Sequence, residues 1–210
     1  MQLVGKLIIK SKDKIIEFLN VQDTGRIASI DENGFPQIIP MNFVFLEDTI
    51  YMHSHVKGEK IDNIKRDSKV GFEVDKNLEF LPSYFSDPDD ASLADTFYIS
   101  VVIKGEAKIV EDKNEKVRAL NGLMKKYQPE GGYLPMNADM EVLEHTAVIK
   151  VIPIEMNGKY KIGQNMSKKD KIDIANKILD RNTNTAKETL EIMGFEIEEG
   201  KAVLKTDEVW

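Results

Sequence analysis

The sequence has no cysteine, only three histidines and a single tryptophan among its 210 residues. The absence of cysteine excludes disulfides, thiolate metal sites and cysteine nucleophiles. Neither a Ser/His/Asp set nor a pair of carboxylates occurs at a spacing typical of acid–base catalysis, so the sequence nominates no catalytic residue and no metal ligand set. His55 and His145 could act as proton donors, although isolated histidines more often have structural roles.

Long apolar runs are also missing. None approaches the ~18 residues of a membrane-spanning helix, and no charged-then-apolar leader opens the chain. We therefore expect a soluble, cytoplasmic protein with no membrane partner. The net charge of -7 and the pI near 5.2 argue against nucleic acid as the main partner. This balance still leaves room for a local basic pocket.

The stretch from Thr49 to Val70 carries the clearest local signal. It predicts a strand over Thr49–His55 and a short helix that opens near Lys57, with Lys57 and Lys60 in its first turn. Two lysines there oppose the helix macrodipole unless an anion is bound. Free backbone N–H groups, a glycine that allows close approach and two ammonium groups suit a phosphate. The alternative is that both lysines are solvated surface residues.

Two β-rich runs precede this stretch. Gly25–Ile30 and Pro36–Leu46 flank Asp31-Glu32-Asn33-Gly34, which predicts a hairpin because Asn-Gly accepts positive φ. With Thr49–His55 they would form a three-stranded antiparallel meander. Pro40 cannot donate to a ladder, so we expect it at an edge or bulge, either beside a flat ligand or without one.

The remaining elements extend this pattern to a mainly β architecture with helices. A long connection over Leu78–Asp95 carries aromatic residues, and Gly105 predicts a bulge or barrel corner. Together the elements favour an antiparallel barrel of about six strands with peripheral helices. The further predicted elements are helix Ser11–Asn20, strand Lys69–Val74, strand Thr96–Val110, helix Lys113–Gln128 and strand His145–Met156.

The chain changes character at Gly158. Residues 158–166 are polar and punctuated by glycine, Ser167 then caps a helix with Asp170 at the box position, and a second helix over Thr183–Met193 ends at Gly194. A chain of this length forms one large domain, or one domain with an appendage. We therefore predict a barrel domain over 1–158 and a C-terminal helical extension over 159–210.

The order and spacing of several motifs resemble those of a known family. The run from Gly25 to Val74 is similar to the FMN-binding split-barrel family related to pyridoxamine 5'-phosphate oxidase. The segments 82–86 and 97–105 resemble its nitroimidazole-resistance-like branch. Residues 158–165 resemble its FMN-binding negative transcriptional regulator branch. The motifs in the first run are Asp31-x-Asn33-Gly34-x-Pro36, Pro40-Met41-Asn42-Phe43, His53-Ser54 and Gly58-x-Lys60.

The resemblance implies a six-stranded Greek-key split barrel that forms a homodimer with two FMN molecules in clefts between the barrels. Lys60 then matches the basic residue that holds the FMN phosphate, with Lys57 as an auxiliary. The pair His53 and Ser54 matches positions against the phosphate and ribityl chain, and Ser100 matches a polar position that reaches the flavin. The strand that runs along the isoalloxazine is matched by Pro40, Met41, Asn42 and Phe43.

The polar segment before the last helices adds one further hypothesis. The amides of Gln164 and Asn165 both donate and accept, which suits the edge of an isoalloxazine, although the segment could equally be a plain connection. If the segment does contact the cofactor, we expect Gln164 or Asn165 to line the flavin or substrate cleft and the two terminal helices to pack over it and limit the access of solvent.

One departure limits the functional reading. Pyridoxamine phosphate oxidases keep an arginine-containing C-terminal segment that grips the substrate phosphate, whereas residues 205–210 read Lys-Thr-Asp-Glu-Val-Trp. We therefore expect an FMN-dependent oxidoreductase of a small, nitroaromatic-like molecule rather than that oxidase. The alternatives are an FMN-binding regulator without turnover, and a split barrel that holds haem or a deazaflavin. The sequence identifies neither the substrate nor the electron donor.

Overall fold

A computed structural model describes residues 5–206, which group into two compact units. We define the barrel unit as residues 13–74 and 101–157, and the terminal unit as residues 5–12, 75–100 and 158–206. One boundary falls between Asn157 and Gly158, beside the predicted limit at 158. The terminal unit also takes in residues 5–12 and 75–100, which we had placed in the barrel domain, so the two-domain division stays a prediction.

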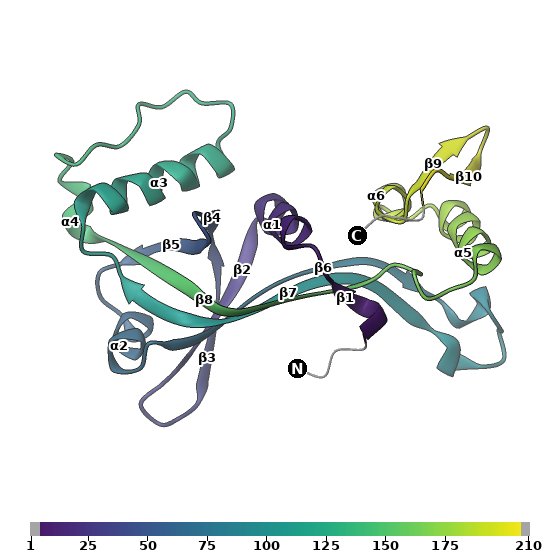
Figure 1. The fold of residues 1–210 in the computed structure, drawn as a ribbon, viewed down its shortest axis with the longest axis horizontal. Helices are drawn as coiled ribbons and strands as arrows, with labels where there is room; N and C mark the ends of the chain where they lie inside the picture. Colours follow the sequence, from purple (N-terminus) through teal and green to yellow (C-terminus); the bar gives the residue numbers. More distant parts are fainter. Residues whose placement is uncertain (1–4, 207–210) are drawn as a thin grey trace. The chain divides into compact units, whose positions relative to one another are not determined.

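The barrel unit is built on one curled sheet (Figure 1). Its strands lie in the order β3-β2-β6-β7-β8-β5-β4, and β3 and β4 are separated along the chain by Phe43 alone. The two ends of the sheet are therefore joined by one bent run, and the sheet curls into a split barrel. Within the described residues it has eight strands where we predicted six, because Phe43 divides one run into β3 and β4 and because the short β1 (Ile8–Ile9) pairs with β8. The other strands are β2 (Thr24–Ile30), β3 (Pro36–Asn42), β4 (Val44–Leu46), β5 (Thr49–His55), β6 (Lys69–Leu81), β7 (Asp95–Ile109) and β8 (Thr146–Lys161).

The predicted split barrel is thus confirmed, but the predicted meander is only partly right. β2 pairs with β3 and β4 pairs with β5, both antiparallel, yet the run Pro36–Leu46 divides between the two ends of the sheet. The reason is the bend at Phe43, which belongs to neither ladder. β6 also continues to Leu81, so part of the predicted connection after Leu78 is strand.

The two hairpin turns have different backbone conformations. In the β2–β3 turn only Gly34 has positive φ, while Asp31 Oδ1 accepts hydrogen bonds from the N–H groups of Asn33 and Phe35 at 2.8 Å each. The hairpin is confirmed, but Asn33 does not use the left-handed region that we invoked for it. In the β4–β5 turn, Glu47 and Asp48 both have positive φ, which matches the twist of a two-residue hairpin.

Helix α3 (Lys113–Tyr127) covers one outer face of the barrel. Asp112 caps it by accepting a hydrogen bond from Glu115 N at 2.7 Å, and Leu120 and Leu123 pack against Val44 and Val148 of the strands. Buried residues alternate with more exposed ones along β2 and β7, and the buried ones form part of the barrel interior. The other helices of the unit are α1 (Lys12–Val21), α2 (Glu59–Arg66) and α4 (Val142–His145).

The terminal unit contains more strand than we predicted. β8 extends through residues 158–161, where β1 (Ile8–Ile9) pairs with it, so half of the predicted linker is strand. Ser167 caps α5 (Lys168–Arg181) as predicted, and α6 (Ala186–Ile192) follows. The C-terminal extension is not wholly helical, because β9 (Phe195–Glu198) and β10 (Lys201–Leu204) form a hairpin. The 3₁₀ turns are η1 (Gly5–Leu7), η2 (Ser83–Phe85) and η3 (Ala91–Leu93).

A buried carboxylate holds the terminal unit together internally. Glu79 in β6 is 4% exposed and accepts hydrogen bonds from Thr183 Oγ1 at 2.5 Å and Thr185 Oγ1 at 2.7 Å. Arg181 Nη1 lies 3.2 Å from the same carboxylate. A buried charge is tolerated only when it is paired and hydrogen-bonded, and these partners come from the end of α5 and the connection that follows it. The contact fixes that connection on β6.

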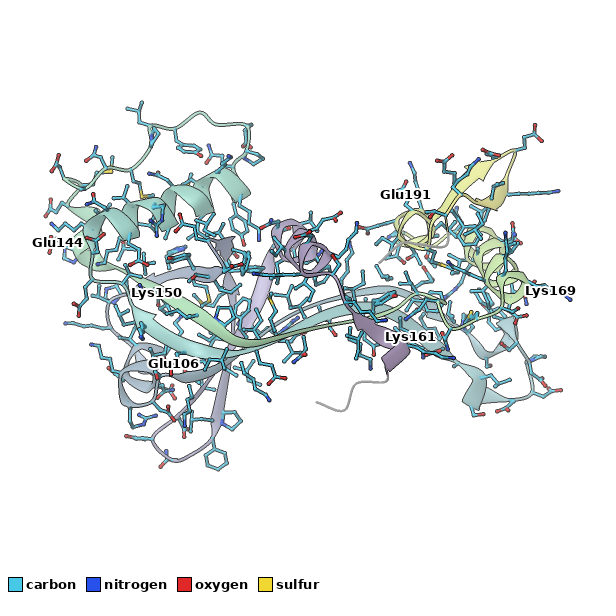
Figure 2. The ribbon with its side chains drawn as sticks, in the orientation of Figure 1. Glu106, Glu144, Lys150, Lys161, Lys169 and Glu191 are labelled. Atoms are coloured by element: carbon cyan, nitrogen blue, oxygen red, sulfur yellow. The ribbon has the colours of Figure 1, made fainter. Side chains whose placement is uncertain are left out.

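Charged side chains such as Glu144, Lys169 and Glu191 project outward from the ribbon (Figure 2). None of the helices formed by residues 5–206 has the length and apolar character needed to cross a bilayer. Trp210 lies outside the described residues.

Candidate functional site

The turn between β5 and α2 differs from our expectation in one respect. Helix α2 begins at Glu59, so Lys57 precedes the helix and only Lys60 lies in its first turn. Gly58 is the N-cap, with φ of 135°, and a Cβ placed there would meet nothing within 4 Å. Glycine is favoured at such a φ, and the space beside it lets a ligand approach the backbone.

The start of α2 has free hydrogen-bond donors. No side chain caps it, and within residues 5–206 the backbone N–H groups of Glu59 and Lys60 have no acceptor. The carbonyl of Gly58 accepts from Ile61 N at 2.9 Å and Asp62 N at 3.2 Å, which starts the helix. Unused N–H groups at a helix start are the usual backbone partners of an anion.

Lys60 supplies a cation at this helix start. Its side chain is half-buried, and its Nζ donates to Met41 Sδ at 3.2 Å, a weak acceptor. No carboxylate of the described residues lies within ion-pair distance of its ammonium group. Burial lowers the pKa of Lys60 from its ordinary value of 10.5. A bound anion would offset this cost, because an opposite charge favours the protonated amine.

The strand opposite Lys60 presents an open edge. β3 is the last strand of the sheet path and pairs only with β2 in the described part of the chain. Pro40, paired in register with Arg26, therefore lies on an edge strand, as predicted. Pro40 and Asn42 are exposed, while Met41 is half-buried against Lys60.

Phe43 is placed differently from its three neighbours. Its side chain is fully buried, with its ring edge-on to Phe72 at 5.2 Å and Lys126 Nζ 3.8 Å from its centre. It supports the strand from inside the barrel unit. A direct contact between Phe43 and a cofactor remains a prediction.

The end of β5 adds imidazole and hydroxyl groups to the same turn. His53 and His55 are exposed and Ser54 is half-buried, in register with Val148, Thr146 and Ala147 of β8. His55 Nδ1 accepts a hydrogen bond from Lys57 N at 3.1 Å, which orients that ring. β5, the turn and α2 therefore gather His53, Ser54, Lys57 and Lys60 on one continuous segment.

The other two predicted cofactor residues belong to the terminal unit. Ser100 is half-buried in β7. Gln164 donates from Nε2 to the carbonyls of Tyr160 at 2.9 Å and Lys6 at 3.1 Å, and its Oε1 accepts from Ile162 N at 2.9 Å. This amide stabilises the loop after β8, while Asn165 is exposed. Their roles at a cofactor stay predictions, and within residues 5–206 no cluster of His, Asp and Glu could hold a metal.

Sequence reasoning missed Lys126 and Tyr127 at the end of α3, which contact Phe43 from outside the barrel. Lys126 Nζ donates to the carbonyl of Leu19 at 3.1 Å. Burial lowers the pKa of Lys126 to about 8, an effect that Asp23 partly opposes. The run Lys125-Lys126-Tyr127 contains no signal that one lysine is half-buried.

This lysine leads to a testable pH dependence. With a pKa of about 8 in the fold and 10.5 as its ordinary value, Lys126 binds fewer protons in the folded than in the unfolded chain between these limits. The free energy of unfolding should therefore rise with pH in this window. Allowing for solvent screening, we expect a gain of about 1–2 kcal/mol relative to Lys126→Met. Urea denaturation from pH 7 to 10.5 measures it.

The neighbouring exposed lysine provides the control for this prediction. Lys125→Met removes a charge from the same turn of α3, but Lys125 is exposed whereas Lys126 is half-buried. Its stability should follow the wild-type pH profile. Parallel profiles for the wild type and Lys126→Met would show that Lys126 does not titrate differently in the folded state.

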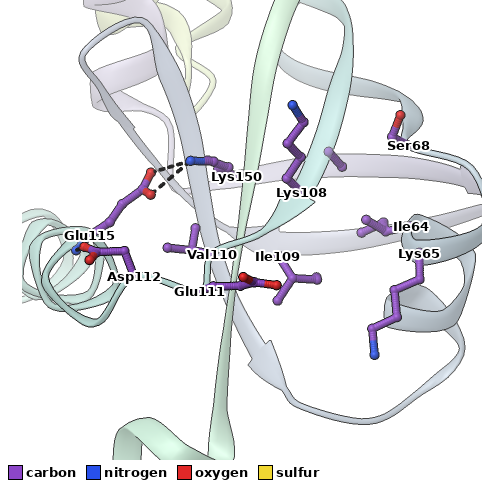
Figure 3. A pocket seen from close by; sticks show the side chains of 11 residues that line it. Ile64, Lys65, Ser68, Lys108, Ile109, Val110, Glu111, Asp112, Glu115 and Lys150 are labelled. Atoms are coloured by element: carbon purple, nitrogen blue, oxygen red, sulfur yellow. Dashed lines mark hydrogen bonds and ion pairs between the residues drawn. The ribbon is translucent and has the colours of Figure 1, made fainter.

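A cavity of about 610 Å³ lies elsewhere in the barrel unit (Figure 3). Glu115 and Lys150 face each other on its wall, with both carboxylate oxygens 2.9 Å from Lys150 Nζ. Burial alone would raise the pKa of Glu115, but hydrogen bonds from Lys150 and Tyr51 outweigh it and the pKa is lowered. The cavity contains none of the predicted cofactor residues, and its lysines Lys65 and Lys108 point in different directions.

Comparisons with known proteins agree with this architecture. Residues 11–160 match the family described as pyridoxamine 5'-phosphate oxidase. A candidate 5-nitroimidazole antibiotic resistance protein from Bacteroides thetaiotaomicron is 26% identical, with a TM-score of 0.62 and coverage of 73% of this chain and 86% of that chain. No protein of curated function matches the sequence.

Two further solved structures share the fold. Flavocytochrome Anf3 from Azotobacter vinelandii is 17% identical with a TM-score of 0.65, covering 77% of this chain and 72% of that chain. The FAD and haem binding protein from Mycobacterium smegmatis is 14% identical with a TM-score of 0.62 and 73% coverage of each chain. At these identities the likeness concerns the fold alone. The family match, in contrast, spans most of the sequence, and the protein therefore belongs to the pyridoxamine 5'-phosphate oxidase family of split barrels.

Proposed function

We propose that the protein binds FMN, with the flavin phosphate at Lys60 and the start of α2, and uses it to reduce a small molecule. One observation carries this proposal. A half-buried ammonium group without a carboxylate partner lies beside an uncapped helix start whose N–H groups have no acceptor in the described part of the chain. A phosphate monoester would satisfy both kinds of donor at once.

The flavin, when bound, supplies the electron transfer, and the protein supplies binding, orientation and access. Lys60, Lys57 and the helix start would hold the phosphate. The exposed edge of β3 at Pro40 and Asn42 offers backbone groups along which a flat ring can lie. His53 and Ser54 would flank the chain that joins phosphate and ring. Ser100 and Gln164 belong to the proposal through the family resemblance alone.

The substrate class is proposed from the relative at 26% identity, which was described as a candidate 5-nitroimidazole antibiotic resistance protein. We propose a nitroaromatic compound as the electron acceptor. Flavin binding without turnover, as in a regulatory protein, is the second candidate. Haem is a third, because two structural neighbours carry haem or cytochrome in their names.

An absorbance spectrum of the purified protein, followed by titration with FMN, FAD and haem, tests the cofactor. We expect oxidised flavin bands and preferential binding of FMN, whereas a Soret band would contradict the proposal. Sedimentation of the same samples tests the homodimer, which we propose from the family resemblance. A flavin-saturated monomer at micromolar concentration would contradict the dimer.

Anaerobic reduction of the flavin-loaded protein with dithionite tests turnover. Addition of a 5-nitroimidazole should restore the oxidised flavin bands as electrons pass to the nitro group. Retention of the reduced spectrum would reject this substrate class and favour the regulatory reading.

A further inference from the structure

The backbone of Phe43 lies between two hydrogen-bonded ladders and belongs to neither. The β2–β3 ladder ends at the pair Thr24 and Asn42, and the β4–β5 ladder includes Val44, which pairs with Tyr51. Phe43 itself is 0% exposed. A buried backbone N–H or C=O without a partner is costly, so this bend requires a partner from outside the sheet.

The hydroxyl group of Tyr127 is that partner. It accepts a hydrogen bond from Phe43 N at 2.8 Å. Its single proton can be donated to the carbonyl of Asp23 at 2.5 Å or to that of Phe43 at 3.0 Å. Because Asp23 directly precedes β2, one phenol joins the bend after β3 to the beginning of the strand with which β3 pairs. Burial raises the pKa of Tyr127, which keeps the proton on the hydroxyl group.

This contact is close in the chain to the proposed phosphate site. Asn42 and Met41 immediately precede Phe43, and Met41 Sδ is the contact of Lys60 Nζ. Lys126, the neighbour of Tyr127, covers the ring of Phe43. The last turn of α3 therefore holds both the backbone and the ring of the residue at which the edge strand bends.

We infer that Tyr127 is a positioning residue for the flavin: its hydroxyl group fixes the bend at Phe43 and thereby places Pro40–Asn42 along the ring and Met41 beside Lys60. The inference rests on the proposed function. Tyr127 does not touch the cofactor in this proposal. It acts through the strand, so its loss should disturb the ring as well as the phosphate end.

Tyr127→Phe keeps the aromatic ring and removes the hydroxyl group. We expect FMN and riboflavin to bind about 10-fold more weakly, both to a similar extent, because the whole edge strand shifts and the N–H of Phe43 loses its acceptor. The visible circular dichroism of the bound flavin at saturation should also change. Both are measured well below the thermal midpoint of the variant.

Tyr51→Phe is the matched control. Its hydroxyl group donates to Glu115 Oε1 at 2.9 Å, so it also links the sheet to α3, but its hydrogen-bond partners are Glu115 and Arg118 rather than the backbone of Phe43. This variant should lose thermal stability while its flavin affinity stays within about twofold of wild type. If Tyr51→Phe weakens flavin as much as Tyr127→Phe, the effect is general destabilisation and the inference is wrong.

If Tyr127→Phe does not fold, amide hydrogen exchange of the wild-type protein still tests the contact between Tyr127 and Phe43. The amide of Phe43 should be among the slowly exchanging amides of the barrel unit. Fast exchange would contradict the contact with Tyr127. If wild type holds no flavin, the proposed function fails and this inference with it. If wild type holds flavin and Tyr127→Phe binds it equally well with an unchanged spectrum, the inference alone fails.

Discussion

Replacement of Lys60 by alanine is expected to weaken FMN binding about 10- to 100-fold and to leave riboflavin binding unchanged, because a charge-assisted hydrogen bond contributes roughly 1.5–3 kcal/mol. Riboflavin lacks the phosphate and therefore gains nothing from this ammonium group. The half-burial of Lys60 strengthens the expected effect, since its charge has few competing partners. Titration calorimetry with both ligands measures the difference.

Two other lysines make the test specific. Lys65 lies in the last turn of the same helix and is exposed, so Lys65→Ala should bind FMN like the wild type. Lys57 is exposed and precedes the helix, so its replacement should have a smaller effect than that of Lys60. Equal losses of FMN and riboflavin in Lys60→Ala would mean that Lys60 does not hold the phosphate.

Gly105→Ala is expected to destabilise the protein by about 1–3 kcal/mol, and Gly105→Val by more than about 3 kcal/mol. A Cβ at Gly105 would lie 2.5 Å from the carbonyl oxygen of Ile152, which is backbone in β8 and cannot rotate away. β7 continues through this residue, so the close approach of β8 accounts for the glycine where we had predicted a bulge or corner. Urea denaturation of the wild type and both variants measures the loss in the free energy of unfolding.

Gly71 provides a matched substitution with the opposite expected sign. A Cβ there would meet only Ala28 Cβ, at an ordinary 3.7 Å. Gly71→Ala should therefore be neutral or stabilise by up to about 1 kcal/mol, because alanine restricts the unfolded chain. Similar losses at Gly71 and Gly105 would contradict the argument from close backbone approach.

Local signals in the sequence predicted the local elements well. The β2–β3 hairpin, the capped start of α5 and the end of α6 near Gly194 all depend on neighbouring residues, and the structure contains them. The β9–β10 hairpin was missed although Glu199 and Gly200, both at positive φ, form its two-residue turn. Alternating residues on either side of a Glu-Gly pair could have revealed it.

The types of residue at the candidate site could be predicted from the sequence, but their exact positions and contacts could not. The segment from His53 to Lys60 joins a strand to a helix as expected, because its charges, glycine and apolar spacing are local features. The predicted helix start lies two residues before the observed one, so Lys57 precedes the first turn instead of belonging to it. One hydrogen-bond partner of the Gln164 amide is the carbonyl of Lys6, which is distant in the sequence, so this contact could not be predicted from neighbouring residues.

The sequence by itself determined most of the strand and helix types, the placement of Pro40 at an edge or bulge and the phosphate-compatible segment around Lys60, since each follows from backbone preference and nearby charge. Only the tertiary structure decided that the run Pro36–Leu46 bends at Phe43, that Met41 lies beside Lys60, and that Tyr127 and Lys126 close over the bend. The physical reason for these three features is burial. A backbone N–H or an ammonium group without a partner costs free energy only when distant segments exclude water from it, and only then does it require a partner from elsewhere in the chain.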